Sequence, residues 1–174
     1  NSPLAAVAAI FHIMNHATFK ASLFMAAGII DHESGTRDIR RLSGLRRPMP
    51  YTATLAMVAA TAMAGVPLLN GFISKEMFFT ETLLVTTPLP WLGSILPYAA
   101  ILYGIFSVTY SLRFIHGTFF GPPPVDLPRQ PKEPPHWMRF PVELLVLLCL
   151  VVGTAPGFSV GPLLDVAVLG VLGD

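Results

Sequence analysis

A short stretch near the start of the chain carries ionisable side chains inside an otherwise apolar segment. His12, His16 and Lys20 follow one another at intervals of four residues. In a helix with 100° per residue, these side chains fall within an arc of about 80° and form one stripe. A charge at the centre of a bilayer costs roughly 2.5 to 3.5 kcal/mol, so we expect this stripe to face protein or water and not lipid. The stripe is therefore the first candidate functional site.

The chemistry that these residue types offer is proton transfer. Histidine titrates near neutral pH without help from its surroundings. Burial disfavours the charged form of a lysine and a nearby negative charge favours it, so a buried lysine with a movable carboxylate partner can load and release a proton. We interpret Lys20 as a proton carrier and His12 and His16 as its relay, although a packing role for each histidine is the alternative. Three polar residues of the same segment are candidates either for hydrogen bonds to the relay or for small-polar packing: Asn15, Thr18 and Ser22.

A second lysine follows a break in another apolar run. Gly65 and Pro67 interrupt that run, and Lys75 comes shortly after them. Proline cannot donate to the carbonyl four residues back and disfavours helical geometry in the residue before it, so we expect the helix to stop near Gly65. A broken helix with an ionisable residue is typical of a transport site. We predict that Lys75 is a site residue; the alternative is an ammonium group that reaches lipid headgroups.

The glutamates near Lys75 are weaker candidates. Glu76 is adjacent to Lys75 in the chain, so its side chain points about 100° away and makes a poor intrahelical partner. Glu76 and Glu81 are both expected to be solvated or interfacial.

Metal and haem chemistry are not expected. His12 and His16 have the spacing of a zinc-binding helix pair, but Ile13 stands where H-E-x-x-H needs its glutamate, and no third ligand cluster is evident. Two histidines one turn apart on one helix would not lie on opposite faces of a haem iron. Cys149 is a single cysteine in an apolar run, which excludes a disulfide within the chain and a cysteine metal cage. We predict no cofactor.

The composition places the chain in a membrane. Its 174 residues are 53% apolar and 12% charged, with a mean hydropathy of +0.62, whereas a soluble domain has about 25% charged residues. The net charge is +1 and the basic residues lie in short connecting stretches, so no nucleic acid partner is indicated. The start at Asn1-Ser2-Pro3 has no charged region before the apolar segment, which argues against a signal peptide. We expect an internal piece of a longer protein that crosses the membrane several times.

The apolar segments predict helices joined by polar loops. We expect spans at residues 4–30, 92–120 and 137–156, a broken segment at 52–85, and a short helix within 157–174. The charged loop at 31–50 and the proline-rich connector at 121–136 must lie outside the hydrocarbon. If the Lys75 segment crosses the membrane, we expect these loops on opposite faces; if it re-enters, we expect them on one face.

Three motifs in order carry a family resemblance: HIMNHATFKASLFMAAG, TRDIRRLSGLRRPMPYT and GVPLLNGFISKEMF. Together they cover residues 11 to 80 and resemble the antiporter-like subunits shared by proton-pumping NADH:quinone oxidoreductase and the Mrp-type multisubunit sodium/proton antiporter. Within this family, the stretch GIIDHESGTRDIRRLSGL is more similar to the large A subunit of the Mrp antiporter than to the distal subunit of the oxidoreductase.

The resemblance implies an all-α membrane helix bundle built from two inverted five-helix repeats, each with a broken helix. This chain would supply part of the second repeat, as an antiporter-like transmembrane domain at 1–120, a proline-rich connector at 121–141 and further transmembrane or interfacial helices at 142–174. Lys20 matches the family's central lysine, His12 and His16 match histidines of the same helix, and Lys75 matches the lysine of the second broken helix.

The function implied is proton translocation in a multisubunit Na⁺/H⁺ antiporter of the bacterial cell membrane. The chain would belong to a transporter and not to an enzyme, with other antiporter subunits, the lipid bilayer, protons and Na⁺ as its partners. One alternative is a proton-pumping subunit of NADH:quinone oxidoreductase. An alternative of another class is a scaffold helix bundle that conducts nothing.

Overall fold

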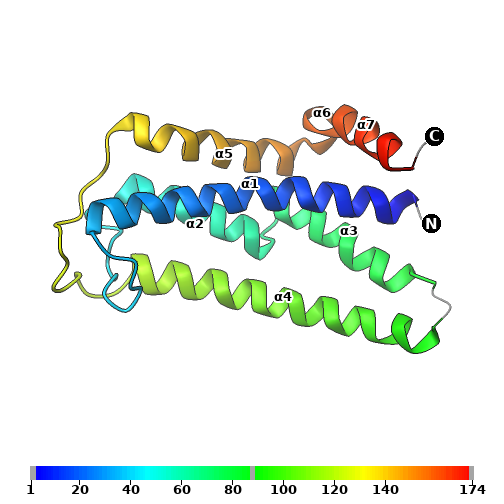
Figure 1. Cartoon of the computed structure of the whole chain (residues 1–174), viewed down its shortest axis with the longest axis horizontal. Coiled ribbons are helices and arrows are strands. Elements are labelled where there is room, and N and C mark those ends of the chain that lie inside the picture. The colour runs from blue at the N-terminus through cyan, green and yellow to red at the C-terminus, as the bar shows by residue number, and fades with distance from the viewer. Residues whose placement is uncertain (1–2, 87–88, 173–174) are drawn as a thin grey trace.

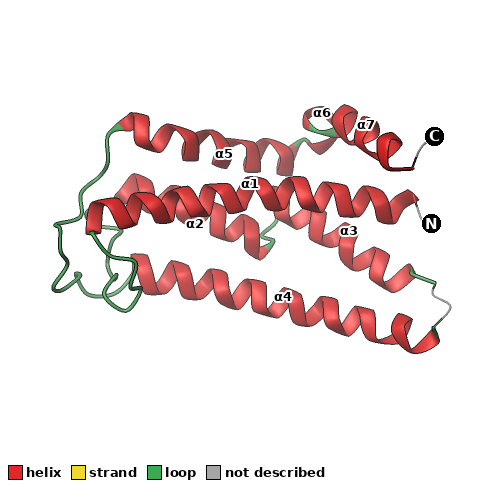
Figure 2. Cartoon of the chain, viewed as in Figure 1, coloured by secondary structure: helices red, strands yellow, loops and turns green. Residues whose placement is uncertain are grey.

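Every regular element in the described part of the chain is a helix, as the sequence predicts (Figures 1 and 2). The computed structural model describes residues 3–86 and 89–172. The first two residues of the predicted domain at 1–120 and the last two of the predicted segment at 142–174 lie outside the described residues. The helices are α1 (Pro3–Ser34), α2 (Pro50–Ala64), α3 (Asn70–Leu84), α4 (Pro90–Phe119), α5 (His136–Thr154), α6 (Pro156–Ser159) and α7 (Gly161–Leu172).

Helix α1 runs through the middle of the molecule, between α4 and α5 (Figure 1). It packs against α2, α3, α5 and α7. The core between α1, α2 and α5 contains buried alanines such as Ala53, Ala56 and Ala59 on α2. Small side chains allow helix backbones to approach closely, which is how helices associate where lipid supplies no hydrophobic driving force.

The predicted break lies between α2 and α3. Gly65 ends α2 with φ 89°, and its N–H donates to the carbonyl groups of Thr61 and Ala62. Glycine adopts this left-handed conformation at little cost, so it closes the helix where Pro67 prevents continuation. Leu68 is also left-handed, with φ 72°, a conformation that costs a non-glycine residue about 1 to 2 kcal/mol. The surrounding packing must therefore hold the break in place.

Two glycines let other backbone segments reach the break. A Cβ atom at Gly71 would overlap the carbonyl oxygen of Ala62, so the start of α3 lies directly against the end of α2. A Cβ atom at Gly153 on α5 would likewise overlap the backbone of Leu68 and Leu69. Helix α5 thus packs directly against the segment between α2 and α3.

The two polar loops lie at the same end of the molecule (Figure 1). The backbone N–H of Arg129 donates to the carbonyl of Ser34 at 3.2 Å, and the Ser43 hydroxyl donates to the carbonyl of Pro122 at 2.8 Å. Helices α2 and α3 together run the length of the bundle, and α4 returns beside them. The expectation that the two loops lie on opposite faces if the Lys75 segment crosses the membrane is therefore wrong, because α4 adds a second crossing between them.

Two helices of the described chain are long and apolar enough to cross a membrane by length and composition, α4 from Trp91 and α5. Helix α4 leaves most of its side chains uncovered, including Ile101, Ile105 and Phe106. An apolar surface of this kind is expected in lipid or within a larger assembly.

Candidate functional site

The ammonium group of Lys75 lies on the end of α2. Its Nζ atom donates to the carbonyl oxygens of Met63 at 2.7 Å and Ala64 at 3.1 Å, and to the hydroxyl oxygen of Ser107 at 2.8 Å. The last carbonyl groups of a helix have no N–H partner within it and carry partial negative charge. We call these three oxygen atoms the carbonyl cradle. Lys75 is only 5% exposed, so its charge points into the protein and not toward headgroups.

Helix α4 supplies the side-chain part of this site. The Ser107 hydroxyl accepts from Lys75 and donates to the Met63 carbonyl at 2.9 Å. Tyr103, one turn earlier, places its ring centroid 5.4 Å from Nζ. Ser107 was not among the site residues predicted from the sequence. Its position four residues after Tyr103 on an apolar helix could have indicated a polar face.

No carboxylate completes the Lys75 site within the described residues. Glu76 is exposed and pairs with no cation there. Among the described residues, two backbone carbonyls and the Ser107 hydroxyl stand where the sequence suggested a movable carboxylate partner.

His12 connects α1 to this site. Its Nδ1 atom lies 3.3 Å from the Ser74 hydroxyl, and its Nε2 atom lies 3.5 Å from the Tyr103 hydroxyl. Ser74 precedes Lys75 and Tyr103 contacts it, so both contacts lead from the histidine to the lysine. The sequence alone did not indicate this connecting role for Ser74 or Tyr103.

The rest of the stripe is less enclosed. The His16 ring centroid is 6.1 Å from that of His12 and 5.4 Å from that of Phe19, but His16 is exposed. Lys20 is partly buried, with Nζ 5.5 Å from the centroid of the Tyr110 ring. It makes no hydrogen bond or ion pair within the described chain, and it borders a cavity of about 90 Å³. The structure brings His12 and Lys75 together and leaves Lys20 at the far end of the stripe.

Asn15, which the sequence placed near the relay, bonds elsewhere. It accepts a hydrogen bond at 3.0 Å from the Asn70 side chain, and both residues are buried. Asn70 is the first residue of α3, so this pair joins the second half of the broken helix to α1. The remaining candidates are Thr18, which donates to the carbonyl of Met14 on its own helix, and Ser22, which is buried without a partner among the described residues.

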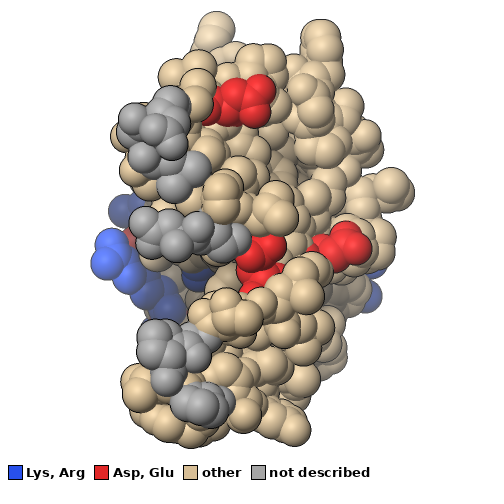
Figure 3. Space-filling model, turned by 90° about the vertical axis from the view of Figure 1, so that its right-hand side faces the viewer, with Lys and Arg blue, Asp and Glu red and all other residues tan. Residues whose placement is uncertain are grey.

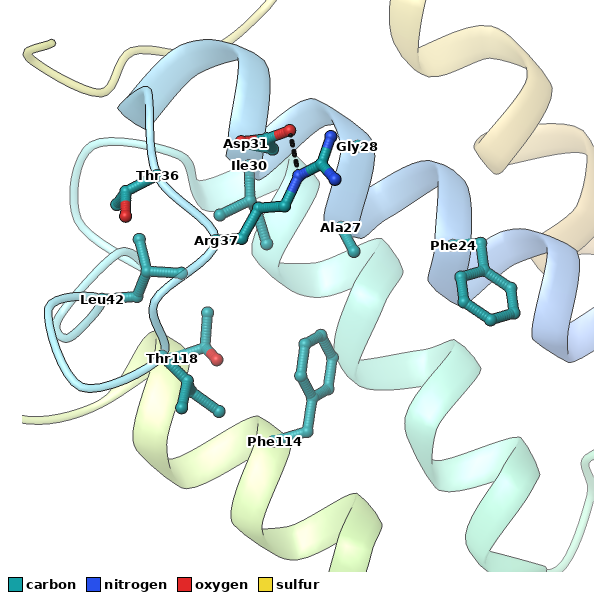
Figure 4. A pocket seen from close by; sticks show the side chains of 11 residues that line it. Phe24, Ala27, Gly28, Ile30, Asp31, Thr36, Arg37, Leu42, Phe114 and Thr118 are labelled. Carbon is teal, nitrogen blue, oxygen red and sulfur yellow. Dashed lines mark hydrogen bonds and ion pairs between the residues drawn. The ribbon is translucent and has the colours of Figure 1, made fainter. Parts of the chain in front are cut away.

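A separate cavity of about 470 Å³ lies at the loop end, between α1, α4 and the loop after α1 (Figure 4). Its lining is largely apolar, with Phe24 and Phe114 facing it and the Asp31–Arg37 ion pair, 2.8 Å, at one side. No lysine of the predicted relay lines it. Among the described residues there is also no group of three or more His, Cys, Asp or Glu placed to hold a metal ion.

The fold and the site together define a class of protein. A helix bundle with a break at mid-helix, and a buried ammonium held on the carbonyls that the break frees, is typical of membrane proteins that move ions.

The comparisons identify the family. Residues 2–106 match the family model for the transmembrane part of NADH:quinone oxidoreductase and the Mrp antiporter. The chain belongs to this family of membrane proteins, and the resemblance seen in the sequence is confirmed. Its all-α membrane bundle is a fragment of the family's domain, whereas its place in the second of two inverted repeats and the division at residues 120 and 141 stay predictions.

Named relatives agree with the family. The chain is 70% identical, over 98% of its length, to the A/B subunit of a probable K⁺/H⁺ antiporter from Rhizobium meliloti (strain 1021), of which it covers 17%. It is 48% identical, over 84% of its length, to the A subunit of a Na⁺/H⁺ antiporter from Bacillus subtilis (strain 168), of which it covers 19%. In the structure of the Mrp complex from Dietzia sp. DQ12-45-1b it matches a chain with a TM-score of 0.80 and 38% identity, over 97% of its own length and 18% of that chain. The chain thus spans about a fifth of these relatives.

Proposed function

We propose that this chain is a proton-translocating part of the large A-type subunit of a multisubunit cation/proton antiporter in the bacterial cell membrane. The names of the relatives support the antiporter, and the family supports the membrane. The observation that carries the proposal is the Lys75 ammonium buried on the carbonyl end of a broken helix. The protein acts in a transporter and not as an enzyme, and its partners are the other antiporter subunits, the bilayer, protons and a metal cation.

The site residues keep the roles predicted from the sequence. Lys20 is the central proton carrier, and His12 and His16 relay protons or position water. Lys75 is the gate toward one aqueous side. The contacts of His12 with Ser74 and Tyr103 support a connection between the stripe and Lys75.

The end of the bundle that carries the polar loops faces the cytoplasm. Eight of the 11 Lys and Arg residues lie in or beside these loops: Arg37, Arg40, Arg41, Arg46, Arg47, Arg129, Lys132 and Arg139. The opposite end, which faces the viewer in Figure 3, presents acidic side chains and has Lys and Arg atoms only at its margins. Cytoplasmic loops carry an excess of Lys and Arg, and this asymmetry supports the orientation.

Sodium is the coupling cation that the sequence resemblance favours, and potassium is the second candidate. The relative with 70% identity belongs to a probable K⁺/H⁺ antiporter, which favours potassium. The Bacillus subtilis relative belongs to a Na⁺/H⁺ antiporter.

A proton-pumping subunit of NADH:quinone oxidoreductase is the alternative within transport, since the family model includes both complexes. A gene neighbourhood with a small multisubunit operon supports the antiporter, and genes for a flavin and iron-sulfur arm support the oxidoreductase. The scaffold alternative predicts that exchange persists after Lys20 and Lys75 are both neutralised.

The test is cation/proton exchange by the intact complex in inverted membrane vesicles. Lys20→Ala is expected to abolish the pH change that Na⁺ or K⁺ drives, because the central carrier is lost. Lys132→Ala, in the polar connector, is the matched control and should exchange at the wild-type rate. Full exchange by an assembled Lys20→Ala complex contradicts the role of carrier.

A further inference from the structure

We propose that the carbonyl cradle also binds an alkali metal cation, so that the Lys75 ammonium and the transported cation occupy one site in turn. This inference rests on the proposed function, which does not itself say where the cation binds. It starts from the contacts at the end of α2, where three oxygen atoms converge on one positive charge at 2.7 to 3.1 Å.

The donor set suits an alkali cation as well as an ammonium group. Met63 and Ala64 contribute backbone carbonyl oxygens and Ser107 contributes a hydroxyl oxygen. Carbonyl oxygens can replace the hydration shell of Na⁺ or K⁺. Unwound carbonyls and the carboxyl ends of half-helices coordinate such ions in transporters, because the helix dipole adds negative potential there.

A cavity beside the cradle provides the space and the approach. It holds about 470 Å³ and is lined by residues that include Ala64, Gly65, Lys75 and Glu76. Water in this cavity can fill the coordination positions that three protein oxygens leave open. The Glu76 carboxylate on its wall raises the local concentration of cations. Glu76 is a poor partner for Lys75, but its carboxylate thus attracts the metal ion to the cavity.

The Lys75 ammonium and the metal ion exclude each other, because both bind the same three oxygen atoms and two positive charges within one site repel each other. The metal ion can enter the cradle only when the Lys75 ammonium has left these oxygen atoms, and the returning ammonium displaces the ion. The titratable groups around this exchange are Glu76 on α3, His12 on α1 and Tyr103 on α4.

The first test changes Ser107, which would lose one oxygen ligand while Lys75 stays. In vesicles with the assembled complex, Ser107→Ala is expected to raise the apparent KM for the transported cation about tenfold, the scale on which metal affinity responds to a lost supporting contact. The maximal rate should change much less, and Ser107→Thr, which keeps the hydroxyl, should restore the KM. Separate titrations with Na⁺ and K⁺ show which ion the cradle prefers. A lower maximal rate with an unchanged KM for both ions overturns the proposal, because Ser107 would then only hold Lys75.

The second test measures binding without transport. The purified complex with Lys75→Met has a cradle without its ammonium, and we expect it to retain one more ²²Na⁺ or ⁸⁶Rb⁺ ion per copy of this chain than the complex with Lys75→Met and Ser107→Ala. Equal binding by the two overturns the shared site. Exchange by the wild-type complex is measured beside it: if wild type exchanges and binding is equal, only this inference fails, whereas absence of wild-type exchange removes the proposed function itself.

Discussion

The two lysines of this chain stand in contrasting surroundings. Lys75 belongs to a broken helix and finds three oxygen acceptors at the break. Lys20 belongs to the uninterrupted helix α1 and finds the face of the Tyr110 ring. The difference shows what a helix break provides: every carbonyl in the middle of a continuous helix is already bonded, whereas the end of α2 offers free carbonyls at the depth of a buried charge.

This contrast assigns different needs to the two charges. The charged form of Lys75 is stabilised by the chain's own backbone. A charged Lys20 in a membrane needs water or further protein around it, since an aromatic face replaces only a small part of its hydration.

The largest effect is expected from closing the space between the two halves of the broken helix. Gly71→Ala places a methyl group onto the carbonyl oxygen of Ala62, so the start of α3 must move and carry Lys75 away from the cradle. We expect loss of exchange, measured in vesicles, together with reduced amounts of assembled complex. Gly28→Ala is the matched control, because nothing lies within 4 Å of its Cβ position. Normal exchange by Gly71→Ala would show that the close approach at the break is dispensable.

The two histidines separate the Lys75 end of the stripe from the Lys20 end. His12→Ala removes the contacts with Ser74 and Tyr103, whereas His16→Ala removes an exposed ring. We expect His12→Ala to slow exchange more than His16→Ala, by about threefold or more, because a polar network loses more than one contact when a connecting member is removed. Initial rates of cation-driven proton flux measure this ratio. Equal rates would argue that the stripe and Lys75 are not coupled through His12.

The amino end of α2 offers a milder change at the opposite end of the helix that bears the cradle. The Glu133 carboxylate accepts from the backbone N–H groups of Tyr51 at 3.1 Å and Thr52 at 2.9 Å, and lies 3.4 Å from Arg139. Loss of a helix cap costs about 1 kcal/mol, so Glu133→Ala should lower the thermal midpoint of the complex. Glu133→Gln keeps one acceptor oxygen and should recover only part of the loss, because its NH2 group cannot accept from the second N–H. An unchanged midpoint for Glu133→Ala would rule out a stabilising role for the cap.

The smallest effect is expected outside both lysine sites. The Arg40 guanidinium holds the pKa of Asp38 below its ordinary value through hydrogen bonds and charge. A lowered carboxyl pKa stabilises the fold above the ordinary pKa, and this contribution is lost as the pH falls through the lowered one. Because the pair is exposed, Asp38→Asn should leave the thermal midpoint at neutral pH nearly unchanged, and any difference from wild type should vanish in acid. A large loss at neutral pH would contradict this account of the loop.

The helices and the break could be predicted because they follow from local chemistry. The apolar run lengths indicated the spans, and Gly65 with Pro67 indicated the end of α2. The prediction that the two loops lie on opposite faces if the broken segment crosses the membrane is incorrect. Helix α4 also crosses between them and brings the chain back to the first face. Placement of the loops therefore depended on the whole topology and not on any one stretch.

The partners of the site residues could not be predicted because they come from distant segments. Ser107 and Met63 meet Lys75 only after α4 has packed beside α2, and a backbone carbonyl leaves no mark in a sequence. Glu133 lies in a proline-rich connector that has no helical pattern, yet it caps α2. Sequence types indicated which residues carry charge, and packing decided what each charge touches.

Replacing Lys75 by a residue that keeps the positive charge but does not release a proton tests whether Lys75 itself moves protons. Arginine stays protonated in proteins, so Lys75→Arg separates the need for a positive charge at the break from the need for a proton carrier. Cation-driven proton flux by the assembled complex in vesicles is the measurement, with complex amounts matched to wild type. We predict that Lys75→Arg assembles and does not exchange. Exchange at the wild-type rate would show that Lys75 serves only as a fixed charge, and would contradict its role in moving protons.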